Sequence, residues 1–213
     1  MNCLVAGASG LIGQSLILEL IENNKFEMIT AIVRTNLLIK DAKLHTIQSS
    51  FDQISSIELP KCEVAFCCLG TTIKKAQSQE AFYKVDHDYV VEFAKACFKA
   101  GVKKFIVVSA LGADEKSKIF YNQVKGKTEI DLQKIKFENL IIVQPSLLLG
   151  KRNESRPAES VSQFIAKTLS PLMKGPLAKV RPVWASQVAR RMILAASDET
   201  LPLGLKIISN DQI

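Results

Sequence analysis

Three residues in the middle of the chain have side chains and spacings suited to moving a proton: Ser109, Tyr121 and Lys125. Tyr121 and Lys125 are four residues apart in a segment with helical periodicity, so both side chains lie on one face, one turn apart. A phenol has a pKa of about 10 and is a poor acid–base catalyst at neutral pH until a cation stabilises its phenolate. Lys125 can supply that charge. Tyr121 would then exchange a proton with a substrate oxygen that Ser109 holds in place.

The alternative is that this tyrosine–lysine spacing arose by chance. Of the three tyrosines, Tyr83 and Tyr89 lack a lysine four residues later, whereas Tyr121 has one. Ser109 directly follows an apolar run that predicts a strand at residues 103–108. The coincidence of these residues with a glycine-rich turn near the N-terminus favours the chemical interpretation.

That glycine-rich turn is formed by Gly7, Gly10 and Gly13. A short apolar run at residues 2–6 predicts a buried strand before it, and the periodicity of residues 11–23 predicts a helix after it. This strand–turn–helix pattern is the phosphate-binding start of a dinucleotide fold. Gly7 would permit the tight turn, Gly10 would let a pyrophosphate approach the backbone, and Gly13 would let the helix pack on the sheet. A tight helix turn that binds no ligand is the alternative.

The residue after the predicted second strand bears on the choice of cofactor. That strand covers residues 27–33 and stops at Arg34. About twenty residues beyond the glycine turn, NAD-dependent proteins usually place Asp or Glu to bind the ribose 2′-hydroxyl, whereas an arginine can bind a 2′-phosphate. Because residues 33–36 include no acid, the sequence favours NADP, with a solvent-exposed arginine as the alternative.

Phe51 and Asp52 follow a short predicted strand at residues 43–48. Their position suits the adenine ring of a cofactor. Phe51 would form one wall of the adenine site, and the ring would make a hydrogen bond near Asp52. A core phenylalanine beside an aspartate in a turn is the alternative.

The remaining segments alternate between apolar strands and amphipathic helices, which predicts an α/β fold: a doubly wound parallel sheet of the Rossmann type with helices on both faces. Predicted strands cover residues 63–69, 103–108, 140–143 and 205–208, and predicted helices cover residues 78–100 and 119–134, with a final helix through Val188 and Met192. Gly70 and Thr71 follow one of these strands, and Pro145 follows another. In an open parallel sheet, the carboxyl ends of the strands form the ligand-binding edge.

The alternation breaks after residue 150. Residues 150–157 are polar and basic, and proline and glycine interrupt the segment beyond them. We expect residues 151–183 to form a small substrate-side loop or lid within one domain that covers residues 1–213. Lys151, Arg152 and Arg156 would bind an acidic substrate or form an exposed docking surface, and a solvated loop without a role is the alternative.

The composition indicates a globular chain that does not cross a membrane. The 213 residues are 47% hydrophobic and 23% charged, and no apolar run reaches the length of a membrane span. The five cysteines form no CxxC pair, so we expect reduced, buried thiols, a cytoplasmic location and no metal site. The net charge of +7 comes from basic residues in ones and twos along the chain, without a nucleic-acid motif. Nucleic-acid binding is therefore disfavoured, and anionic phosphates or acidic substrates account for the charge equally well.

The Gly7-x-x-Gly10-x-x-Gly13 turn, Ser109 and Tyr121-x-x-x-Lys125 together resemble the short-chain dehydrogenase/reductase superfamily, in its atypical and extended branch. Nearly the whole chain resembles the small Tat-interacting-protein-like oxidoreductases more closely. The stretches that carry this similarity are residues 68–72, 85–90, 112–114, 121–126 and 154–157. Two features depart from the wider superfamily. The turn is not the Gly-x-x-x-Gly-x-Gly form of the standard enzymes, and the chain lacks the large C-terminal substrate domain of the sugar epimerases.

The resemblance implies a Rossmann fold that binds NADPH, with Ser109, Tyr121 and Lys125 as the catalytic set. It also implies that several residues line the cofactor: Gly7, Ser9, Gly10, Leu11, Ile12 and Arg34, with Leu69, Gly70 and Thr71 against its ribose. The expected cofactor-binding set is completed by Gly13, Asp52 and Pro145, together with the three catalytic residues.

The sequence therefore predicts an NADPH-dependent oxidoreductase of the atypical short-chain type that acts on a small carbonyl or alcohol. The first alternative is a catalytically weak or inactive NADPH-binding regulator that signals through a protein partner. The second is nucleotide-sugar epimerisation, which needs a larger pocket than this C-terminal region is expected to build. The substrate, the direction of the reaction and a homodimer or other protein partner are left open.

Overall fold

The computed structural model describes residues 1–150 and 180–213. Seven strands form one sheet in the order β3-β2-β1-β4-β5-β6-β9, and each neighbouring pair runs parallel. The strands are β1 (Asn2–Ala6), β2 (Met28–Val33), β3 (Leu44–Gln48), β4 (Val64–Cys67), β5 (Lys104–Val108), β6 (Asn139–Gln144) and β9 (Gly204–Ser209). The strand order reverses between β1 and β4, where open parallel sheets of this kind bind ligands. The predicted doubly wound parallel sheet is confirmed.

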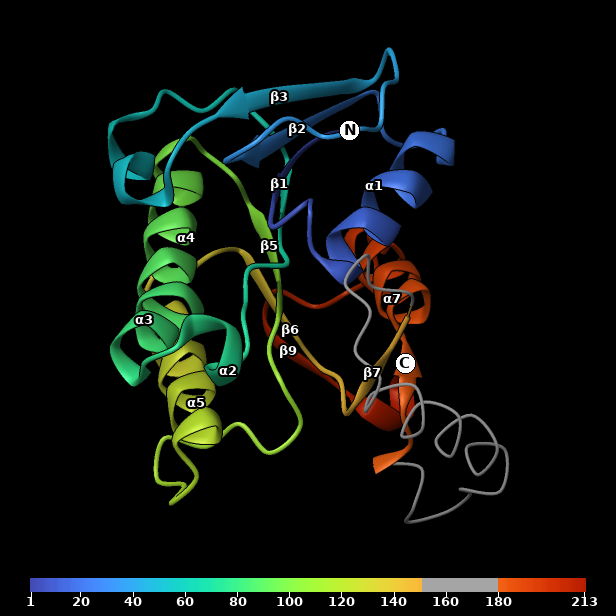
Figure 1. Ribbon diagram of the computed structural model, residues 1–213. Helices are drawn as coiled ribbons and strands as arrows, with labels where there is room; N and C mark the ends of the chain where they lie inside the picture. The colour runs from blue at the N-terminus through green and yellow to red at the C-terminus, as the bar shows by residue number, and fades with distance from the viewer. Residues whose placement is uncertain (151–179) are drawn as a thin grey trace.

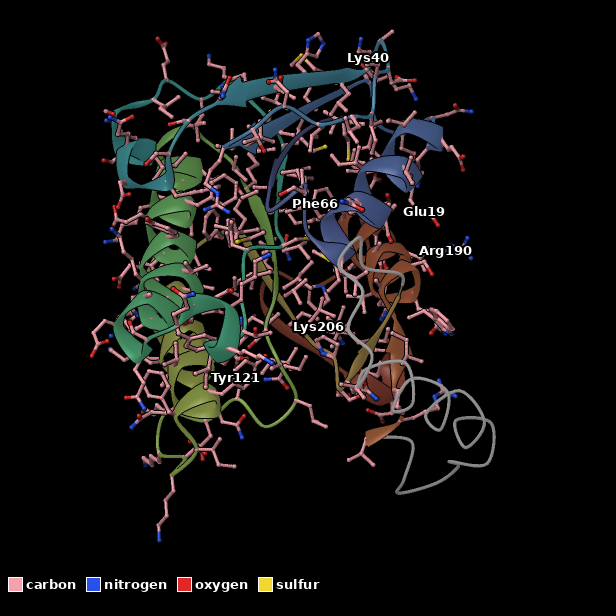
Figure 2. The ribbon with its side chains drawn as sticks, viewed as in Figure 1. Glu19, Lys40, Phe66, Tyr121, Arg190 and Lys206 are labelled. Carbon is pink, nitrogen blue, oxygen red and sulfur yellow. The ribbon has the colours of Figure 1, made fainter. Side chains whose placement is uncertain are left out.

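Helices cover both faces of the sheet (Figure 1). The main ones are α1 (Leu11–Glu22), α4 (Tyr89–Lys99), α5 (Phe120–Gln133) and α7 (Ala185–Ser197). On one face of the sheet, strand residues such as Val5 pack against α1 and α7. On the opposite face, strand residues such as Leu4 pack against α4 and α5. Both Val5 and Leu4 are fully buried, because successive strand side chains point to opposite faces and both faces are covered. On the exposed side of the α1–α7 pair, Arg190 Nε lies 2.7 Å from Oε1 of Glu19 (Figure 2).

The predicted helix at residues 78–100 contains a π turn. It divides into α3 (Gln79–Tyr83), a π-helical turn η2 (Lys84–Asp88) and α4. A π turn takes in one more residue than an α turn and changes which side chains face inward. Here the adjacent residues Asp86 and His87 are both buried, at 1% and 8% exposure. Two short elements, η1 (Phe51–Ser56) and α2 (Ile73–Ala76), have no counterpart in the sequence prediction.

Residues 151–179 lie outside the described part of the chain, so most of the predicted lid, with Lys151, Arg152 and Arg156, is not described here. Beside that segment, β7 (Leu148–Leu149) pairs in parallel with β8 (Val183–Trp184). The assignment of residues 1–213 to a single domain stays a prediction. Among the described helices, none has the length and hydrophobicity needed to cross a membrane.

Candidate active site

The three glycines of the N-terminal turn have different roles in the structure. Gly7 has φ +79, and a Cβ there would lie 2.5 Å from the carbonyl carbon of Cys68, at the end of β4. A Cβ on Gly13 would overlap the carbonyl oxygen of Gly7. Gly10 is exposed, and its Cβ would meet that same oxygen at 3.2 Å. Backbone packing therefore requires glycine at positions 7 and 13, whereas the exposed backbone of Gly10 is open to the approach of a ligand.

The start of α1 is suited to an anion. Gly10 occupies the N-cap and has no side chain to bond the first-turn N–H groups, and that turn contains no acidic residue. The positive end of the helix dipole and these N–H groups favour a phosphate. Ser9 is exposed and Leu11 half-buried beside it, while the Ile12 side chain is part of the core. The turn therefore fits a pyrophosphate, approached through its backbone.

The residues expected around the adenosine lie at the ends of β2 and β3. Arg34 is exposed after β2. The carboxylate of Asp52 lies 2.7 Å from Lys84 Nζ and accepts a 2.9 Å hydrogen bond from the Tyr89 hydroxyl. The hydrogen bond from Lys84 is the largest factor that lowers the pKa of Asp52. Phe51 is 6% exposed and packs on aromatic rings of α4, so it is a core residue and not an open wall. The cofactor roles of Arg34 and Asp52 stay predictions.

The segment after β4, residues 68–71, lies beside both the glycine turn and the predicted catalytic lysine. The Thr71 N–H donates a 2.8 Å hydrogen bond to Oδ2 of Asp86. A Cβ on Gly70 would lie 3.2 Å from Oδ1 of Asp86 and 3.7 Å from Nζ of Lys125. Leu69 is half-buried against the α4–α5 core. Residues 69–71 therefore lie directly over a pair of charged groups at the carboxyl edge of the sheet.

That pair is Lys125 and Asp86, whose Nζ and Oδ1 atoms are 2.7 Å apart. Their side chains are 7% and 1% exposed. Burial alone would lower the pKa of Lys125, but the carboxylate of Asp86 and the hydroxyl of Tyr121 outweigh it, so the pKa is raised. The lysine is therefore held as a buried cation, as its predicted role requires.

Tyr121 lies one turn before Lys125 on α5 (Figure 2). Its ring packs on Phe82 of α3, with centroids 5.6 Å apart. The first turns of α5 are fixed by the loop before the helix, because the Asp114 N–H donates to the Asn122 carbonyl at 3.0 Å. Gly126 allows this close approach, since a Cβ there would overlap the backbone of that loop.

Ser109 follows β5 and is 7% exposed. Its hydroxyl donates a hydrogen bond to Oε1 of Glu129, which follows Lys125 by one turn of α5. The side chains of Ser109, Lys125, Asp86 and Glu129 line one small cavity between α5 and the sheet. Pro145, after β6, is buried and its carbonyl accepts the Leu111 N–H at 2.9 Å.

The structure thus brings Ser109 and Lys125 to one cavity. Tyr121 is not among the residues that line this cavity, and it lies one turn of α5 before the lysine. The sequence prediction missed Asp86, Glu129 and Gln144. Glu129 had a local signal, because it continues the four-residue spacing of Tyr121 and Lys125 on the same helix face. The catalytic and cofactor-binding assignments stay predictions.

The strand order, the glycine turn and the uncapped start of α1 define a Rossmann-type NAD(P)-binding protein. Residues 7–142 match the NAD(P)H-binding family, and the chain belongs to it. The chain is 37% identical to the protein fmp52, mitochondrial, of Emericella nidulans over 177 residues, which is 79% of this chain and 76% of that protein. It is 35% identical to HTATIP2 of Rattus norvegicus over 163 residues, 74% of this chain and 67% of that one. The expected resemblance to the Tat-interacting-protein-like group is confirmed.

Solved structures show the same fold. The human epimerase family protein SDR39U1, isoform 2, with NADPH superimposes with a TM-score of 0.67 at 17% identity. The match covers 100% of this chain and 77% of that one. At this identity the likeness concerns the fold alone.

The cytoplasmic location expected from the sequence is wrong. FMP52 relatives from four organisms, at 31% to 37% identity, are named mitochondrial. The expectation rested on buried thiols and the lack of a membrane span, and these features exclude neither compartment. Four of the five cysteines, Cys3, Cys62, Cys67 and Cys97, are buried, whereas Cys68 is partly buried.

Proposed function

We propose that this protein is an NADPH-dependent oxidoreductase that acts on a small carbonyl or alcohol. The observation that carries the proposal is the buried Lys125 cation, one turn from Tyr121 on α5 and under residues 69–71 of the phosphate-binding edge. When bound, the nicotinamide supplies or accepts the hydride. The Lys125 cation stabilises the negative charge that forms on the Tyr121 oxygen when the phenol gives up its proton.

In carbonyl reduction, Tyr121 gives its proton to the substrate oxygen, and in alcohol oxidation it takes that proton back. Ser109 holds the same oxygen by a hydrogen bond. Asp86 keeps Lys125 in place, because the ion pair at 2.7 Å fixes the ammonium group below Gly70. The open backbone at Gly10 and the start of α1 bind the pyrophosphate.

We propose NADP over NAD as the preferred cofactor. The support is Arg34, exposed at the end of β2, in a segment without an acidic residue to bond a ribose 2′-hydroxyl. The family covers NADH and NADPH alike, and the related human structure was solved with NADPH. We further propose a mitochondrial location, on the names of the FMP52 relatives. Fractionation of cells that express the tagged chain tests it, and a signal confined to the cytosol refutes it.

The function is tested by NADPH oxidation against a panel of aldehydes, ketones and quinones. Tyr121→Phe should lower turnover about a hundredfold and leave NADPH affinity nearly unchanged, because only the proton carrier is lost. Lys125→Met should lower both. Tyr83→Phe is the matched control, since Tyr83 has no lysine four residues later, and it should keep wild-type turnover. Turnover unaffected by Tyr121→Phe would refute the assignment.

The same assay addresses the regulatory alternative. If the wild type binds NADPH tightly but turns over none of the compounds, the oxidoreductase proposal fails. A protein partner that associates only with the NADPH-bound form would then identify the chain as a cofactor-dependent regulator.

A further inference from the structure

The buried carboxyl group of Glu129 lies beside the proposed catalytic residues and has no part in the chemistry described above. Glu129 is 8% exposed. Its Oε1 accepts the Ser109 hydroxyl, and Gln144 Nε2 lies 2.9 Å from Oε1 and 3.1 Å from Oε2. Lys125 pairs with Asp86 instead. Within the described part of the chain, the hydrogen bonds to this carboxyl therefore come from the neutral groups of Ser109 and Gln144.

The hydrogen bond to Glu129 limits what Ser109 can offer a substrate. A serine hydroxyl has one proton and two lone pairs, and an ionised carboxylate only accepts hydrogen bonds. While Glu129 is ionised, the Ser109 proton points to it, and Ser109 can only accept from a substrate. A substrate carbonyl then receives no hydrogen bond from Ser109, and neither does a substrate alcohol, whose one hydroxyl proton must go to Tyr121.

Protonation of Glu129 reverses this arrangement. The carboxyl O–H then donates to the Ser109 oxygen, because a protonated carboxyl is a donor. The Ser109 proton is released and can bond a carbonyl oxygen. The added proton stays on Glu129 throughout, since Tyr121 exchanges the proton of the reaction. Gln144 continues to donate to the other carboxyl oxygen.

We propose that Glu129 is a positioning residue whose protonation frees the Ser109 hydroxyl to donate a hydrogen bond to the substrate oxygen. This rests on the proposed function of the site and adds a control of its rate by pH. Burial raises the pKa of Glu129 and so favours its protonation, while hydrogen bonds from Ser109 and Gln144 and the charge of Lys125 oppose the rise. Reduction and oxidation pass through the same transition state, so protonation of Glu129 should speed both, and its ionisation should slow both.

The groups that face Glu129 come from each element around the cavity. Lys125 is the cation on its own helix, and Asp86 of the π turn neutralises it. β5 contributes Ser109 and β6 contributes Gln144, neither of which titrates in this range. Among these groups, Glu129 is the carboxyl whose pKa is raised, first by burial.

The first arm of the test does not need turnover. Carbon-13 NMR of the glutamate side-chain carboxyls in the full-length protein follows Glu129, and Glu129→Gln identifies its signal. We expect Glu129 to titrate above the exposed glutamates. Ser109→Ala should raise its midpoint further, because a donor to the charged form is lost. The exposed Ser56 is the control, and Ser56→Ala should leave the midpoint unchanged.

The second arm compares benzaldehyde reduction by NADPH with benzyl alcohol oxidation by NADP, as profiles of kcat/KM against pH. In the wild type, ionisation of Glu129 should lower kcat/KM about tenfold in both directions, the worth of one hydrogen bond. Glu129→Gln should remove this step and keep reduction at its acid level, because an amide always has a proton to donate.

The two arms separate the possible failures. A step that persists in Glu129→Gln, or a Glu129 midpoint that Ser109→Ala does not move, overturns the control by Glu129 and leaves the proposed function standing. A Glu129 midpoint that Ser109→Ala raises, in a wild type without turnover, refutes the proposed function and supports the hydrogen bond by which Glu129 controls Ser109.

Discussion

Removal of the Lys125 ammonium group tests the buried ion pair at the centre of the site. Lys125→Met leaves the Asp86 carboxylate, 1% exposed, with the Thr71 N–H as its remaining partner among those described here. Breaking a buried pair by removing one member costs about 3–5 kcal/mol, a large share of the roughly 5–15 kcal/mol that holds a domain folded. Asp86→Asn should cost a comparable amount, because it strands the buried lysine. The double variant removes both charges and should cost clearly less than the sum of the two.

Urea unfolding followed by circular dichroism measures the three free energies of unfolding at neutral pH. Lys127→Met is the matched control on the same helix. Lys127 is 47% exposed and lies 3.1 Å from Asp131, so its loss should cost less than about 1 kcal/mol. A Lys125→Met variant as stable as this control, or strictly additive losses in the double variant, would show that the pair is not a buried, coupled unit.

Three further predictions concern the turn, the cofactor and the pH dependence of stability. Gly10→Ala should keep the thermal stability and lose NADPH affinity, whereas Gly13→Ala should lower the melting temperature; equal effects on both would contradict the division of roles. Arg34→Asp should remove a preference for NADPH over NADH of about ten- to a hundredfold, measured by fluorescence titration, and equal wild-type affinities would refute it. The pKa of Asp131 is lowered, most strongly by a hydrogen bond from Lys134. The ionised Asp131 side chain therefore stabilises the folded protein at pH values above the ordinary aspartate pKa, and this stabilisation is lost as the pH falls. The stability difference between wild type and Asp131→Asn should therefore shrink below about pH 4, and a difference independent of pH would contradict this.

The sequence was sufficient for the features that depend on local spacing. The glycine turn and the alternating strands and helices predicted the sheet, because the central strands have apolar runs and the main helices have apolar faces. The four-residue spacing of Tyr121 and Lys125 placed both on one side of α5. Phe51 shows the limit of this reasoning, since a phenylalanine after a strand suits a ligand wall and a core equally well, and the structure places it in the core.

The partners of these residues could not be predicted because they depend on packing between distant segments. Asp86 reaches Lys125 because the π turn of η2 changes the inward face of a helix whose periodicity looked uninterrupted. Gln144 meets Glu129 because β6 ends beside α5, across fifteen residues of sequence. The sequence predicted that Ser109 would hold the substrate oxygen. Its hydrogen bond to Glu129 could not be predicted, because it depends on the packing of the end of β5 against α5.

The central claim is that Tyr121 carries the proton for hydride transfer at this edge of the sheet. It is tested most directly with NADPH that carries deuterium at the transferring C4 position and benzaldehyde as the acceptor. Mass spectrometry should find the deuterium on the carbon of the product benzyl alcohol for the wild type, with the rate lowered about a hundredfold by Tyr121→Phe. Benzyl alcohol without deuterium, or a labelled product formed equally fast by Tyr121→Phe, would contradict the account.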